Sequence, residues 1–105
     1  MAKQSDLRKA NTILEQLGGA GKLTAMIGAH TFMGTEEGTL TFQFRAKAHN
    51  GANRIHIVLN ANDYYDVTFY KGRGVNIRAI GSVYDVPVGS LRRVIQDATR
   101  LYLSI

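Results

Sequence analysis

Three short segments in the middle of this sequence alternate apolar and polar residues with a period of two. They are residues 39–45, 54–60 and 64–71. Such alternation is typical of a strand with one face on the core and the other toward solvent or a partner. The apolar positions, expected on the core face, are Leu40, Phe42, Phe44, Ile55, Ile57, Leu59, Tyr65, Val67 and Phe69. The alternation therefore predicts an antiparallel sheet with one open face.

Amphipathic helices are expected before and after these strands. Near the N-terminus, Ser5 or Asp6 can cap a helix that Gly18 and Gly19 end. Its apolar stripe is Leu7, Ala10, Leu14 and Leu17, widened by Ile13. Residues 20–29 favour a second, short helix, with a strand as the alternative. Pro87 suits the first turn of a last helix, whose stripe is Val88, Leu91, Val94, Ile95, Ala98, Leu101 and Tyr102.

A fourth strand is predicted at residues 75–80, and residues 81–85 extend or bend it. Residues 46–53 form a loop, 61–63 a short turn, and the glycines of 72–74 break the third strand from the fourth. The expected fold class is α+β. We expect a four-stranded antiparallel meander with the N- and C-terminal helices packed on one face, a two-layer sandwich in a single domain over residues 1–105.

Composition narrows the partners. The 105 residues include no cysteine, so disulfides, thiolate metal sites and cysteine nucleophiles are excluded. No apolar run approaches the roughly 20 residues of a membrane span, and the first ten residues have no apolar stretch typical of a signal peptide. We therefore expect a cytoplasmic protein. Thirteen Lys and Arg against eight Asp and Glu give a net charge of +5, which favours a polyanionic partner such as nucleic acid.

No motif points to catalysis. Residues 18–24 look briefly like a phosphate-binding loop, but the first glycine is missing and Leu23 follows Lys22 where Ser or Thr is required. The histidines, His30, His49 and His56, share no metal-ligand spacing. No serine or threonine stands in a nucleophile motif. We therefore predict no catalytic residues, no metal, no cofactor and no enzymatic activity.

The open face of the sheet carries the main functional prediction. Its expected polar residues include Thr41, Gln43, His56 and Thr68. The residues expected to contact phosphates are Arg45, Lys47, Arg54, Lys71, Arg73 and Arg78. Tyr64 and Tyr70 are expected to stack on unpaired bases. Arg92 and Arg93 of the last helix are expected to point away from this face. The plain alternative is an ordinary solvated sheet face, where Thr, Tyr and Arg are common strand residues.

Several stretches resemble a family of small, functionally uncharacterised proteins encoded by bacteriophages and mobile elements. They are residues 13–19, 22–32 and 65–69, Val83-Tyr84, and the C-terminal residues 91–105. The resemblance implies a bacterial host and supplies no catalytic residues. Arg100 stands where the resemblance leads us to expect glycine, so the last helix is expected to run further.

Two functions follow from the sequence. The first is a nucleic-acid-binding accessory protein, with DNA among its partners, that uses the basic, aromatic sheet face. The alternative is a protein-interaction module that binds or inhibits a host or defence complex, or that self-associates through the same face or an exposed sheet edge.

Overall fold

Along the chain, helices precede and follow a continuous series of strands, an order that suits an α+β fold. The computed structural model describes residues 8–35 and 38–101. The elements are α2 (Arg8–Gln16), α3 (Ala20–Ile27), β1 (His30–Thr35), β2 (Thr39–Gln43), β3 (Arg54–Leu59), β4 (Tyr65–Lys71), β5 (Arg78–Val86) and α4 (Leu91–Thr99). The single 3-10 turns η1 (Gly74–Asn76) and η2 (Val88–Ser90) precede β5 and α4.

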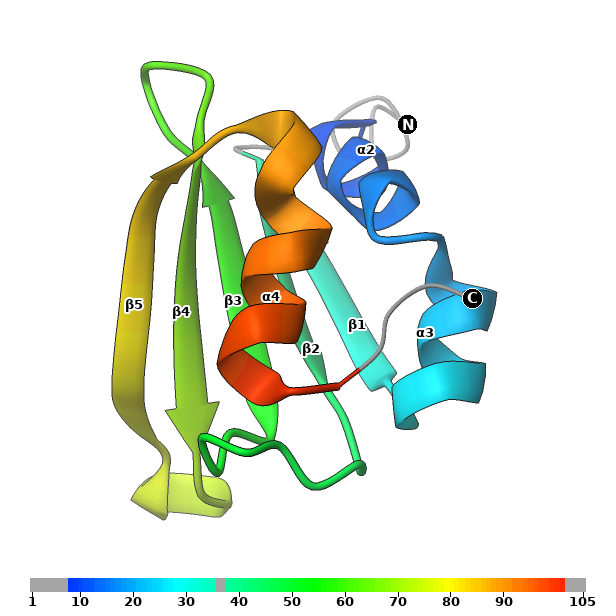
Figure 1. The fold of residues 1–105 in the computed structure, drawn as a ribbon, viewed down its shortest axis with the longest axis vertical. Coiled ribbons are helices and arrows are strands. Elements are labelled where there is room, and N and C mark those ends of the chain that lie inside the picture. The colour runs from blue at the N-terminus through cyan, green and yellow to red at the C-terminus, as the bar shows by residue number, and fades with distance from the viewer. Residues whose placement is uncertain (1–7, 36–37, 102–105) are drawn as a thin grey trace.

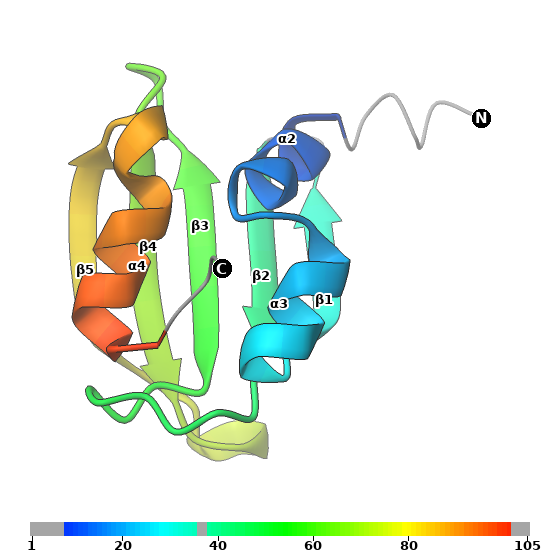
Figure 2. The ribbon, with the colours of Figure 1, turned by 45° about the vertical axis from the view of Figure 1, so that its right-hand side comes forward.

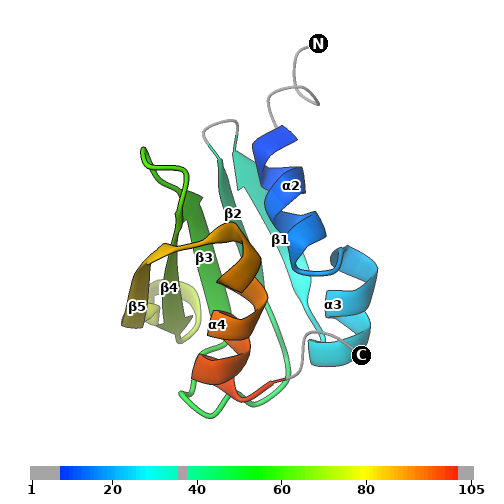
Figure 3. The ribbon, with the colours of Figure 1, turned by 45° about the horizontal axis from the view of Figure 1, so that its top comes forward.

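The strands form one antiparallel sheet in the order β1-β2-β3-β4-β5. The three described helices lie on one face of it, with α4 across the half that contains β3 and β4 and with α2 and α3 over β1 and β2 (Figures 1 and 2). The opposite face carries no helix in the described part of the chain (Figure 3). The predicted α+β class is confirmed, but the sheet has five strands rather than four.

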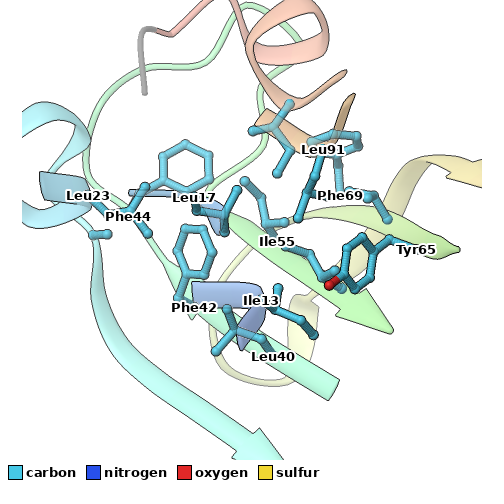
Figure 4. Packing of buried hydrophobic residues seen from close by; sticks show 14 of the residues in the cluster. Ile13, Leu17, Leu23, Leu40, Phe42, Phe44, Ile55, Tyr65, Phe69 and Leu91 are labelled. Carbon is cyan, nitrogen blue, oxygen red and sulfur yellow. The ribbon is translucent and has the colours of Figure 1, made fainter. Parts of the chain in front are cut away.

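The three alternating segments form the centre of the core. Leu40 pairs with Ile57, which pairs with Val67, and Phe42 pairs with Ile55, which pairs with Phe69. These six side chains are at most 3% exposed. They pack against the buried residues of α2 and α4 (Figure 4), which include Ile13, Leu17, Leu91 and Ile95. Burial of each such side chain contributes about 2 kcal/mol, so these strands supply a large part of the hydrophobic stabilisation of the fold.

The additional strand is β1, which the sequence pattern does not reveal. Its side chains are mostly exposed, with a bulge between His30 and Met33 where Thr31 has a φ of 57°. Phe32 alone packs inward, with its ring centroid 5.4 Å from that of Phe42. Backbone pairing with β2 therefore holds β1, and no period of two is imposed on its sequence.

The predicted fourth strand begins later and ends later than expected. Val75 lies in η1 and is 99% exposed, so the strand prediction for residues 75–77 was wrong. The strand β5 starts at Arg78 and continues to Val86, so residues 81–85 extend it. Eight of its nine residues are exposed.

The end of the first helix and the short second helix agree with the predictions, but both ends of the last helix differ. Pro87 is extended and precedes the single turn η2, so α4 begins only at Leu91 and not at Pro87. Gly18 and Gly19, at φ values of 105° and 91°, separate α2 from α3, and residues 20–27 are helical. The last helix ends at Thr99 because Arg100 adopts the left-handed conformation, with a φ of 62°. The Thr99 hydroxyl donates to Ile95 O at 2.7 Å and accepts from the Leu101 N–H at 3.3 Å. The expectation of a longer helix was wrong.

The proposed caps Ser5 and Asp6, together with Tyr102, lie outside the described residues. Across the part of the chain that the structure describes, no helix combines the length and the apolar character that crossing a membrane requires.

Candidate nucleic-acid interface

Two connections meet at one end of the sheet and border an open hollow. In a meander, alternate connections lie at the same end, so the β2–β3 loop (residues 44–53) and the β4–β5 turn (residues 72–77) are neighbours. Both lie at the lower end of the sheet in Figure 1. The space between them has a volume of about 1030 Å³ and is lined by residues of both connections and of the adjoining strand ends.

The lining of this space is cationic. It includes Arg45, Lys47, Arg54, Lys71 and Arg73, with His30 at one side. No Asp or Glu is among its lining residues. Within the described residues, 8–35 and 38–101, none of these five cations forms an ion pair. Five like charges repel one another unless an anion neutralises them. We call this site the basic hollow.

The β2–β3 loop is fixed by the C-terminal ends of two helices. The N–H groups of Arg45 and Ala46 donate to the backbone oxygen of Ile27, which is the last residue of α3, at 3.2 and 3.0 Å. The His49 N–H donates to Thr99 O at the end of α4, at 2.7 Å. Helix C-termini stabilise nearby cations, which is a structural reason for Arg45 and Lys47. It does not account for Lys71, at the end of β4, or for Arg73, in the β4–β5 turn.

The β4–β5 turn depends on Gly72. Its φ is 125°, and a Cβ there would lie 2.3 Å from Asn76 O, so no side chain fits without moving the backbone. The Asn53 side-chain amide donates to Gly72 O at 3.1 Å, which ties the turn to the β2–β3 loop. The turn fixes Lys71 and Arg73 on either side of Gly72. The Lys71 Nζ lies beside Gly51, 3.5 Å from where a Cβ would stand, so its ammonium group reaches across the hollow.

The hollow continues onto the open sheet face through Arg54 and Tyr70, which are paired across β3 and β4. The ring of Tyr70 meets that of His56 edge to face, at a centroid distance of 6.3 Å and an interplanar angle of 86°. His56 Nδ1 lies 2.8 Å from Thr41 Oγ1. Burial lowers the pKa of His56 below its ordinary 6.5, so this imidazole is neutral at pH 7. On the open face, the His56 ring therefore offers a surface for contact with a base, and Arg54 supplies the positive charge.

Seven of the eight predicted site residues lie at or beside the basic hollow. Five line it, Tyr70 adjoins it through Arg54, and Arg78 is paired with Lys71 at the start of β5. Tyr64 does not join them. It follows Asp63 in the β3–β4 turn, at the opposite end of the sheet, and β4 begins only at Tyr65. Arg92 and Arg93 lie on α4, outside the hollow.

Sequence reasoning missed three residues that build the site. His30 was not assigned to the hollow because β1 was not predicted. Asn53 and Gly72 were read only as loop residues, although they make the hydrogen bond that joins the two connections. The break at residues 72–74 was the available signal for Gly72, since a glycine between two strands often marks a positive φ.

Two observations on the described residues concern metal binding and catalysis. Within the described residues, no group of three or more His, Asp or Glu side chains is placed to hold a metal ion. On the open face, His56 contacts the hydroxyl of Thr41 and not a carboxylate of the kind that orients a catalytic histidine.

Comparisons with known proteins give no family. No family model, no curated protein and no solved structure matches this chain. The resemblance to bacteriophage proteins therefore stays a prediction.

Proposed function

We propose that this protein binds nucleic acid without catalysis, holding backbone phosphates in the basic hollow. One observation carries the proposal: five cationic side chains, from two connections and the adjoining ends of β3 and β4, line one hollow, and no Asp or Glu lines it. Phosphate neutralisation and the release of counterions are the main source of affinity in such interfaces. The origin of the protein in a bacteriophage or mobile element, and its cytoplasmic location, belong to the same proposal.

A single strand suits this site better than a duplex. The cations line a concave space of about 1030 Å³, whereas reading the major groove of a duplex needs a helix or a two-stranded ribbon that protrudes into it. A flexible strand can bend its phosphates into the hollow. Its bases then lie toward Tyr70 and His56, whose rings occupy the adjoining part of the open face.

Fluorescence anisotropy with a labelled oligothymidylate of about 20 nucleotides tests the proposal. Measured over a salt series, five phosphate contacts predict a slope of log affinity against log salt of about −3.5. Lys71→Ala/Arg73→Ala is expected to weaken binding about tenfold and to flatten the slope by about 1.4. The matched control is Arg92→Ala/Arg93→Ala, which removes two positive charges from α4 and leaves the hollow intact.

Two results would contradict the proposal. One is the absence of salt-sensitive binding at low ionic strength. The other is an equal loss of affinity in the two double variants, which would assign binding to net charge rather than to the hollow. Tyr70→Leu separates nucleic acid from polyanions in general: it should weaken oligothymidylate binding and leave heparin binding unchanged, because heparin has no bases to stack.

A second candidate function is a protein-interaction module. Large exposed apolar side chains gather near one edge of the sheet: of the seven described, five lie between Val75 and Val88. Exposed apolar side chains on a sheet edge are typical of protein-interaction sites.

A further inference from the structure

The strand β5 is an unusually bare edge. It is the last strand in the sheet order, so one side of its backbone faces no other described strand. Eight of its nine residues are exposed. At the left margin of the sheet in Figure 1 it extends along almost the full height of the sheet. A long unpaired edge is a template for another strand, and most proteins protect it with lysine, proline or inward-pointing charges.

The interior of β5 lacks these protective residues. Residues 79–84 contain no charged side chain and no proline. Ile80 and Val83 are each 36% exposed, and Tyr84 is 68% exposed. Two irregularities interrupt the pairing with β4, but the strand still has nine residues, more than any other in the described sheet.

The two ends of β5 carry opposite charge. Arg78, at its start, is paired with Lys71 beside the basic hollow. Asp85, near its end, donates its backbone N–H to Asp66 Oδ1 at 3.0 Å. In an antiparallel pair, the end of the partner strand lies beside Arg78 and its start lies beside Asp85. The best partner therefore has a basic residue at its start and an acidic residue at its end. A second copy of β5 has this arrangement.

We propose that two copies of this chain pair antiparallel through β5 and form a continuous ten-stranded sheet. A two-fold axis through Ser82 places Ile80 of one copy opposite Tyr84 of the other, twice by symmetry. It also brings the basic end of each copy beside the acidic end of its partner. Parallel pairing would instead place Arg78 against Arg78.

The proposed dimer leaves the basic hollow open, because the hollow is lined by residues from the β2–β3 loop and the β4–β5 turn and not by β5. It would present two hollows at diagonally opposite corners of one sheet. The pairing stands without the nucleic-acid proposal, since a monomer and a dimer both retain the hollow.

Sedimentation velocity over a concentration series tests the pairing. The wild-type chain is expected to reach twice its mass of 11.6 kDa. Tyr84→Lys is expected to raise the dissociation constant at least about tenfold, because the lost pair with Ile80 is counted twice. The control is Val75→Lys, the same apolar-to-lysine change at a site that is 99% exposed and outside β5.

Three outcomes would overturn the proposal: a wild-type monomer at every concentration, a dimer that Tyr84→Lys leaves intact, or equal weakening by Val75→Lys. Hydrogen exchange gives a second reading on the wild-type chain alone. Alternate amides of residues 79–84 should gain protection as the concentration rises, because every other N–H of an edge strand points outward. Exchange in β5 that does not depend on concentration would contradict the pairing.

Discussion

The two ends of the sheet differ in charge and in how the charges are satisfied. At the basic end, Arg54, Lys71 and Arg73 form no side-chain hydrogen bond or ion pair within the described part of the chain. At the acidic end, the carboxylates of Asp66 and Asp85 both accept from the Asn60 side-chain amide, at 3.1 and 2.9 Å. The acidic groups are therefore occupied in holding the chain together, and the basic groups are not.

This difference separates structural charge from charge that is available for binding. The side-chain oxygen of Asn60, Oδ1, also accepts from the N–H groups of Asn62 and Tyr64, so one side-chain amide organises the β3–β4 turn. The acidic residues have a local structural reason to be where they are. The five cations of the basic hollow have such a reason only in part, through the helix C-termini, and their self-repulsion disfavours the folded state unless an anion binds.

Changing the charge at each end, by reversal at the basic end and by neutralisation at the acidic end, tests the comparison most severely. Lys47→Glu/Arg73→Glu should weaken oligothymidylate binding about 100-fold or more, because two attractive contacts become repulsive. At the acidic end, Asp63→Asn should change the affinity less than about twofold. Asparagine tolerates the φ of 63° at that position. Anisotropy at fixed salt measures both, and a comparable change at the two ends would remove the distinction between them.

The two glycines of the β4–β5 turn give the next largest effect. Gly72→Ala places a Cβ 2.3 Å from Asn76 O, and we expect a loss of about 2 kcal/mol in the free energy of unfolding. Gly74→Ala meets no atom within 4 Å although its φ is 56°, so it should cost about 1 kcal/mol. Urea denaturation compares them. Equal losses would show that strain in φ, rather than the backbone contact at Gly72, shapes the basic hollow.

The same contrast explains what the sequence predicted of the fold. The core strands β2, β3 and β4 were recognisable because each buries one face, which forces apolar and polar residues to alternate. The edge strands bury little, so nothing forces alternation on them. His30–Thr35 was therefore missed, and β5 was placed three residues too early. Both are held by backbone pairing, which leaves no trace in side-chain pattern.

The residues of the site were largely predictable from the sequence, but their position at one end of the sheet was less so. Arg45 and Arg73 lie far apart in the sequence, and only the meander brings their connections to one end of the sheet. The same rule shows why the prediction of Tyr64 does not fit the site: its turn is the intervening connection, which must lie at the other end. The volume of the hollow and the contact between Asn53 and Gly72 depend on loop conformations that periodicity does not describe.

At the acidic end, Asn60→Ala should cost about 1.5 kcal/mol in the free energy of unfolding. The substitution removes one hydrogen bond from each of two carboxylates and from each of two backbone N–H groups. The control is Asn62→Ala in the same turn, whose exposed side chain should matter by less than about 0.5 kcal/mol. Urea denaturation of the two variants gives the comparison. A small effect of Asn60→Ala would mean that the acidic end is no better satisfied than the basic end.

The smallest expected effect concerns His56, which lies between the two ends on the open face. Burial lowers its pKa below 6.5 in the folded chain. As pH falls below 6.5, the unfolded chain binds a proton that the folded chain does not, so the free energy of unfolding should decrease through this window. His56→Gln should remove that part of the decrease, seen as a shallower fall in Tm between about pH 7 and pH 5. An unchanged slope would instead assign the pH dependence to other groups, and His56 would then be no more costly to protonate than a histidine in solvent.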